Sequence, residues 1–175
     1  MHGIRIIDLT RVLAGPLATQ QLADQGAEII KIEPPTGDET RFFGPFHQDQ
    51  STYFLCANRN KRAMTLDLKQ PEGRAILERL LVTGDVMIHN FRPGVAERLG
   101  VDFDTVHQAH PQLVYVAIHA FGEDAGEWTR RGGYDLVLQA LGGAPSITGR
   151  PTDPPTKCGA SVADIITAHL ATQAV

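Results

Sequence analysis

A single carboxylate stands at the start of an apolar segment near the end of the sequence. Asp164 follows the small residues 159–161, and residues 162–175 have the pattern of an apolar helix. A carboxylate in this position can cap the helix or act as a nucleophile. Small neighbours let a substrate approach it closely. From the residues alone, capping is the commoner role.

Two other groups of polar and apolar side chains follow predicted strands. The first is the turn after residues 4–9, which consists of Arg11, Val12, Leu13 and Ala14. The second is Asn90 and Phe91 at the end of the run 85–91, followed by Arg92 and, one turn into the next helix, Arg98. An amide and an aromatic ring suit a nucleotide, and arginines pair with phosphates. The structural alternatives are a tight turn and a solvated loop.

Strand and helix patterns alternate along the chain. Apolar and β-branched runs predict strands at 4–9, 28–33, 63–68, 85–91 and 113–118. Helical patterns occupy 17–25, 71–81, 95–99, 103–109, 134–141 and the segment from 162 onward. The aromatic-rich segment 39–60 predicts a long loop. The alternation predicts an α/β fold with a doubly wound, mainly parallel sheet, in which ligands bind beyond the carboxyl ends of the strands.

The composition narrows the classes of partner and compartment. The 175 residues are 42% hydrophobic and 21% charged, with a net charge of -4, as expected of a soluble globular domain without a nucleic-acid partner. The apolar runs are too short to span a membrane. Cys56 and Cys158 make neither a disulfide framework nor a zinc pattern, so we expect a protein of the reducing cytosol with no metal site.

The opening motif and the segment before Asp164 together resemble a known family. The residues are Asp8-Leu9-Thr10-Arg11-Val12-Leu13-Ala14-Gly15-Pro16 and the stretch from Gly133-Tyr134-Asp135 to Asp164. They resemble the family III CoA-transferases, the formyl-CoA transferase and carnitine CoA-transferase group, along essentially the whole chain. The resemblance implies a Rossmann-like CoA-binding domain. It also implies transfer of CoA from an acyl-CoA donor to a small carboxylic acid through a covalent intermediate on Asp164.

The resemblance assigns roles to further residues. It implies that CoA is bound by Arg11, Val12, Leu13, Ala14, Arg41, Asn90, Phe91 and Arg98. Tyr134 would contact the acyl group, and Asp135 would orient a neighbouring group. The chain departs from the family pattern at His89, where a glutamate usually precedes the Asn-Phe pair.

The apolar helix runs to Val175 without a glycine, a proline or a charged last turn. Members of the family are longer and continue into a smaller second domain and a C-terminal return segment. We therefore expect residues 1–175 to be the N-terminal part of the large CoA-binding domain, or a naturally short version. The resemblance also implies an intertwined homodimer.

Two alternatives remain at this stage. The α-methylacyl-CoA racemases share the fold but use a histidine where this chain has Tyr134, and tyrosine is a poor base at neutral pH. A non-catalytic CoA-binding subunit is the second alternative. The sequence identifies neither the acyl donor nor the acceptor acid.

Overall fold

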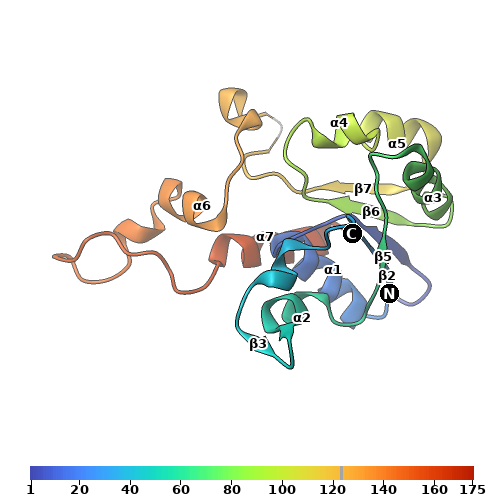
Figure 1. Ribbon diagram of the computed structural model, residues 1–175. Coiled ribbons are helices and arrows are strands. Elements are labelled where there is room, and N and C mark those ends of the chain that lie inside the picture. The colour runs from blue at the N-terminus through green and yellow to red at the C-terminus, as the bar shows by residue number, and fades with distance from the viewer. Residues whose placement is uncertain (123) are drawn as a thin grey trace.

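The computed structural model describes residues 1–122 and 124–175 (Figure 1). A five-stranded sheet is at its centre, with the order β5-β2-β1-β6-β7 and every pairing parallel. Its strands are β1 (Arg5–Asp8), β2 (Glu28–Glu33), β5 (Lys61–Thr65), β6 (Val86–His89) and β7 (Val114–Ala117). This sheet confirms the predicted α/β fold.

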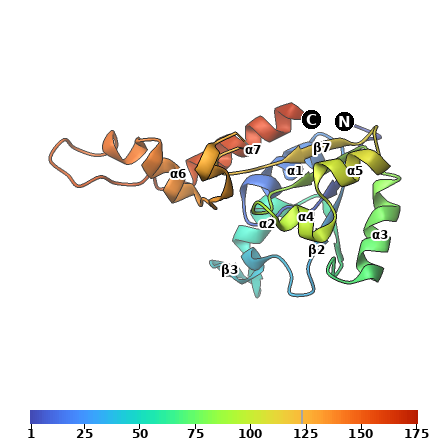
Figure 2. The same ribbon diagram turned by 90° about the horizontal axis from the view of Figure 1, so that it is seen from above.

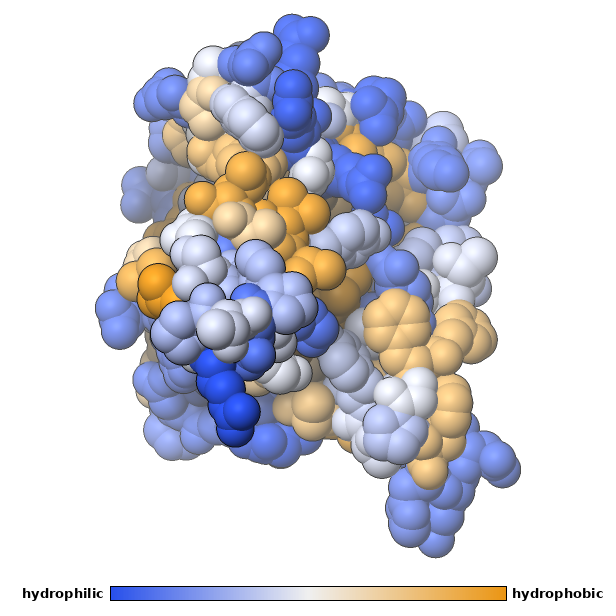
Figure 3. Space-filling model, turned by 90° about the vertical axis from the view of Figure 1, so that its left-hand side faces the viewer, coloured by the Kyte–Doolittle hydropathy of each residue, from blue (hydrophilic) through white to orange (hydrophobic). Residues whose placement is uncertain are grey.

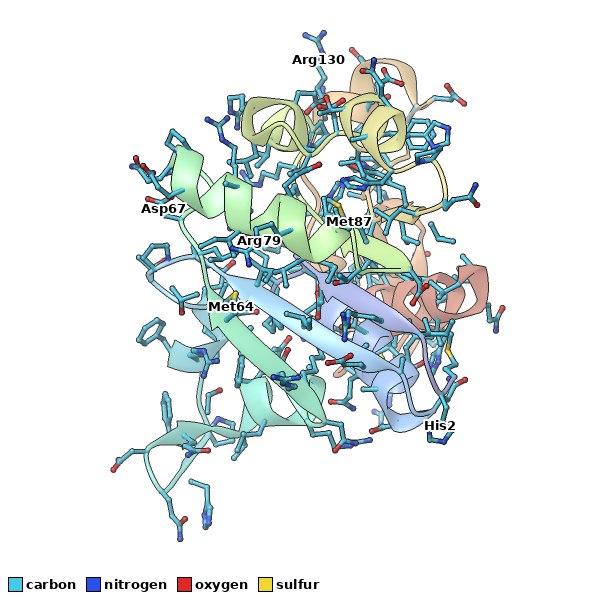
Figure 4. All side chains as sticks on the ribbon, turned by 90° about the vertical axis from the view of Figure 1, so that its right-hand side faces the viewer. His2, Met64, Asp67, Arg79, Met87 and Arg130 are labelled. Atoms are coloured by element: carbon cyan, nitrogen blue, oxygen red, sulfur yellow. The ribbon has the colours of Figure 1, made fainter. Side chains whose placement is uncertain are left out.

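Helices cover both faces of the sheet, because successive side chains of a strand point to opposite faces. Ile7 and Met87 pack toward α3 (Pro71–Leu81), α4 (Val95–Leu99) and α5 (Phe103–Ala109). Ile6 and Ile88 pack toward α1 (Ala14–Asp24) and α7 (Val162–Ala174). Figure 2 shows these two layers from above, and Figure 4 shows α3 on one side of the sheet and α1 on the other.

The strand order places a crevice between β1 and β6. The chain runs outward from β1 through β2 to β5, and then returns to the other side of β1 to form β6 and β7. β1 and β6 lie side by side, with Asp8 opposite Ile88 and the Leu9 N–H donating to the Ile88 carbonyl at 2.8 Å. The loops that follow these two strands therefore leave the sheet in opposite directions. Ligands of doubly wound sheets bind at this point.

Several element boundaries differ from the sequence prediction, most of all those of α1 and β5. α1 begins at Ala14 rather than residue 17, because Pro16 lies in the first turn, where its missing N–H would have no helical partner. The third sheet strand is Lys61–Thr65 rather than 63–68, paired with β2 from Lys61 opposite Ile29 onward. Leu66 and Leu68 have left the strand and are buried beneath α3.

The segment predicted to be a long loop contains short regular elements. A 3-10 helix, η1 (Glu39–Phe42), precedes an antiparallel hairpin of β3 (Phe46–His47) and β4 (Gln50–Ser51). The helix α2 (Thr52–Asn58) follows, and the Ser51 hydroxyl caps it by accepting from the Phe54 N–H at 3.1 Å.

An arm projects from the body between β7 and α7 (Figures 1 and 2). It contains η2 (Gly126–Arg130), α6 (Asp135–Leu141) and η3 (Ala144–Ser146), and its loop carries Ile147, which is 88% exposed. α7 then returns to the body and packs along α1. Among the described residues, the helices are too short or too polar to cross a membrane.

Candidate active site

A cavity of about 270 Å³ opens where the loops after β1 and β6 meet the base of the arm. It brings together eight of the residues proposed for the site: Arg11, Val12, Leu13, Ala14, Asn90, Phe91, Tyr134 and Asp164. They come from four separate segments of the chain. The crevice between β1 and β6 is therefore continued by the arm and by the first turn of α7.

Asn90 joins the first two of these segments. Its Oδ1 accepts from the Arg11 N–H at 2.9 Å, and its Nδ2 donates to the Arg11 carbonyl at 2.7 Å. The Asn90 side chain thus binds both the backbone N–H and the backbone carbonyl of Arg11. The carboxamide holds the turn after β1 against the loop after β6.

His89 supports Phe91 from inside the protein. Its Nδ1 accepts from the Phe91 N–H at 3.2 Å, so Nε2 carries the proton and donates to the Tyr115 hydroxyl at 2.7 Å. The two rings stack with centroids 5.1 Å apart. Burial lowers the pKa of His89 to about 4, with a smaller contribution from His119, so the ring is neutral near pH 7. The residue that departs from the family pattern therefore has a complete set of hydrogen bonds.

A different carboxylate caps the helix that carries Asp164. Oδ1 of Asp135 accepts from the N–H groups of Ala163 and Asp164, at 2.8 and 3.3 Å. Its Oδ2 accepts from Gln139 Nε2 at 2.6 Å. The residue before α7, Ser161, makes no side-chain cap. The first turn of α7 is thus fixed from α6, which leaves the Asp164 carboxylate free of capping.

The Asp164 carboxylate faces the cavity in a half-buried position. Burial and, to a smaller extent, the negative charge of Asp135 together raise its pKa to about 6. The N-terminus of α7 acts in the opposite sense, because its exposed dipole favours an anion. Within the described ranges, we find no hydrogen-bond donor for this carboxylate. It is therefore a poorly solvated anion at neutral pH.

Two arginines proposed for CoA lie outside the cavity. Arg41 makes a two-pronged ion pair with Glu33, at 2.7 and 2.6 Å, and its guanidinium lies 3.8 Å from the Phe54 ring centroid. Arg98 is exposed on α4, with its guanidinium beside Gly94. Their contacts with CoA remain predictions.

Three arginines line the cavity: Arg11, Arg92 and Arg131. Arg131 was not among the residues proposed from the sequence, and its guanidinium carbon lies 4.3 Å from the Trp128 ring centroid. The pair of arginines at 130 and 131, directly before Gly132 and Gly133, is the sequence feature that could have indicated it. Three arginines around one cavity suit an anionic ligand such as a phosphate or carboxylate.

Comparison with known proteins identifies the family. The family model for CoA-transferase family III matches residues 1–175. The chain therefore belongs to CoA-transferase family III, which confirms the resemblance seen in the sequence.

Curated relatives are identical to this chain at about two fifths of the aligned positions. It is 42% identical to a succinate–glutarate CoA-transferase of Agrobacterium fabrum, over 100% of this chain and 46% of that protein. It is also 42% identical to a formyl-CoA:oxalate CoA-transferase of Streptomyces coelicolor, over 94% of this chain and 40% of that protein. The chain thus spans less than half the length of these relatives.

Solved structures agree with the fold. A CAIB/BAIF family protein from Brucella suis superimposes with a TM-score of 0.91 at 37% identity, over 99% of this chain and 48% of that one. A hypothetical protein from Mycobacterium tuberculosis gives the same TM-score, identity and coverage.

The pKa of Asp164 leads to a prediction about stability. The folded value of about 6 lies above the ordinary value of 3.8, so ionisation opposes folding. The loss of stability caused by ionised Asp164 is absent below pH 3.8 and complete above about pH 6. We expect Asp164→Asn to raise the free energy of unfolding at pH 7.5 by about 1–2 kcal/mol, after reduction for partial exposure. Urea titrations from pH 4 to pH 8 should show the gain vanish at the acid end.

Asp104→Asn is the matched control, because Asp104 lies in the first turn of α5 and is exposed. It should lose a few tenths of a kcal/mol at pH 7.5, through the helix dipole. A gain for Asp164→Asn that is equal at pH 4 and pH 8 would contradict the assigned pKa.

Proposed function

We propose that this chain provides the CoA-binding and nucleophilic part of an acyl-CoA:carboxylate CoA-transferase that works through a covalent intermediate on Asp164. The observation that carries the proposal is a half-buried, uncapped carboxylate in a cavity lined by arginines. A pKa of about 6 keeps this carboxylate mostly ionised at neutral pH, as a nucleophile must be. Poor solvation of the anion favours attack on a thioester.

In the first half of the reaction, an Asp164 carboxylate oxygen attacks the thioester carbonyl of the acyl-CoA. The carbon–sulfur bond breaks, which gives a mixed anhydride and the CoA thiolate. The thiolate then attacks the Asp164 carbonyl carbon of the anhydride. The donor acid leaves as its carboxylate, and CoA remains bound to Asp164 as a thioester.

In the second half, the acceptor carboxylate attacks the Asp164 thioester and expels the CoA thiolate. The thiolate attacks the acceptor carbonyl of the new anhydride. The acceptor leaves as its CoA thioester, and the Asp164 carboxylate is restored. Both kinds of intermediate hydrolyse readily, so the site has to exclude water during the cycle.

The proposed roles of the other residues follow from their positions. The phosphate groups of CoA lie among the cavity arginines, with Arg11 and Arg131 facing them, and the acyl end lies beside Asp164. Tyr134, at the start of α6, contacts the acyl group. Asp135 holds the first turn of α7, so it positions Asp164 without reacting itself.

The acceptor is a small carboxylic acid. Succinate, glutarate and oxalate appear in the names of the relatives, so these dicarboxylic acids are the first to assay. The comparisons do not favour a racemase-like enzyme or a non-catalytic subunit.

The proposal extends to the assembly. We regard residues 1–175 as the N-terminal part of the large domain of a cytosolic, intertwined homodimer. Exposed apolar side chains on α7 and on the arm support this, among them Ile166, Leu170 and Ile147. Figure 3 looks at the molecule from the side of the arm and shows hydrophobic surface gathered there.

The nucleophilic role predicts a split between catalysis and binding. Asp164→Ala should lower the rate of CoA transfer at least about 1000-fold, because the group that forms the covalent bond is gone. The Kd for CoA should change less than about threefold, because the carboxylate does not bind the nucleotide. Calorimetry with CoA and a transfer assay with succinyl-CoA measure the two effects, with Asp104→Ala as the control. Substantial transfer by folded Asp164→Ala protein would refute the role.

The assembly predicts a concentration-independent dimer. Sedimentation velocity at micromolar concentration should give a single dimeric species, since an interface that covers Ile166 and Leu170 buries apolar surface. Leu170→Glu should produce monomers, whereas Glu97→Lys, at an exposed position of α4, should not. A sharp monomer boundary for the unaltered chain, with no binding of an apolar dye, would rule the dimer out.

A further inference from the structure

The wall of the cavity contains a strained residue. Val12 has a φ of +68°, in the left-handed region where a β-branched side chain is rarely found. It follows Arg11 directly and lines the cavity. A strained conformation persists only where the surrounding structure enforces it. Contacts around Val12 must therefore hold its φ positive, and these contacts help to shape the cavity.

A buried ion pair holds the turn on both sides of Arg11. Lys31 Nζ donates to the Thr10 carbonyl at 2.8 Å and pairs with Asp38 Oδ2 at 3.0 Å. Asp38 Oδ1 accepts from the Val12 N–H, at the long distance of 3.5 Å. The two charged side chains are each 1% exposed. One carbonyl and one N–H of the strained turn are thus bound to the same ion pair.

The position of Asp38 is itself fixed. The Thr40 N–H and hydroxyl donate to Asp38 Oδ1 at 3.0 and 2.8 Å. The Asp38 N–H donates to Glu33 Oε2 at 2.9 Å, and Glu33 is the partner of Arg41. Arg41, predicted from the sequence to bind CoA, therefore supports the turn through Glu33 and Asp38.

Stability alone gives a weak reason for this arrangement. Removing two charges from water is costly, and a buried pair can often be replaced by uncharged side chains of similar size with no loss of stability. A hydrogen-bonded pair does, however, fix the directions of the groups around it. Its effect should therefore be seen in the shape of the turn more than in the unfolding free energy.

We propose that the Lys31–Asp38 ion pair is a positioning device that keeps Val12 in the left-handed conformation and so sets the wall of the cavity formed by residues 11–14. The expected effect on CoA binding rests on the proposed function. The expected effect on the backbone conformation of Val12 is independent of that function. Neither residue touches the cavity, so both act through Val12.

The test removes both charges together, so that neither is left buried alone. In a crystal structure of the double variant Lys31→Met/Asp38→Leu, the Thr10 carbonyl has lost its donor at residue 31 and the Val12 N–H has lost its acceptor at residue 38. We therefore expect φ at residue 12 to become negative. The Kd for CoA should rise at least about 10-fold. Adding Val12→Gly should return the Kd to within about threefold, since glycine adopts positive φ without strain.

The outcomes separate the two proposals. A positive φ at Val12 in the double variant overturns the positioning role, whether or not CoA binds. If the unaltered protein does not bind CoA, the proposed function fails, while the backbone conformation still decides this inference. If it binds CoA and the double variant binds equally well, the positioning role also fails.

A second variant decides the matter if the double variant does not fold. Val12→Gly alone, with the ion pair intact, should raise the urea midpoint, because it removes strain that the pair maintains. Val82→Gly is the control, because Val82 is exposed and has an ordinary φ of −54°; its midpoint should fall. A lower midpoint for Val12→Gly would show that no strain is held at this turn and would overturn the proposal.

Discussion

The site depends on one carboxylate from α6 that caps a helix to which it does not belong. Asp135 binds the two N–H groups at the start of α7, and this leaves the Asp164 carboxylate without a structural task. The same contact brings a second negative charge close to Asp164, which adds to the effect of burial on its pKa. One interaction therefore positions the proposed nucleophile and makes its ionisation less favourable. Functional sites often contain charged groups that lower the stability of the fold but are needed for the reaction.

Buried charged side chains also hold the wall of the cavity that residues 11–14 form. Asp8 and Lys61 form a second buried pair beside the Lys31–Asp38 pair, and Lys61 also donates to the Pro16 carbonyl in the first turn of α1. Burial lowers the pKa of Lys61 to about 8, although Asp8 opposes the change. Charges in the interior thus bind backbone groups around the turn at residues 10–12. The two walls are held by different networks, and Asn90 connects the second wall to the loop after β6.

The sequence predicted the sheet well, because β-branched runs such as residues 28–33 have few other structures available to them. It predicted the strand at 63–68 two residues too late, since the pattern of apolar residues does not reveal the register that pairs Lys61 with Ile29. The resemblance directed attention to Asp164, but that another carboxylate caps its helix depends on a contact between residues 28 positions apart. The positive φ of Val12 could not be predicted, because valine avoids that region.

The most direct test of the central claim is chemical trapping at Asp164. The protein is incubated with succinyl-CoA, treated with hydroxylamine and digested, and the peptide that contains Asp164 is weighed by mass spectrometry. An anhydride or thioester on this side chain is converted to a hydroxamate, so the account predicts the hydroxamate mass on this peptide and its absence without acyl-CoA. An unmodified Asp164 peptide from protein that is transferring CoA would contradict the account.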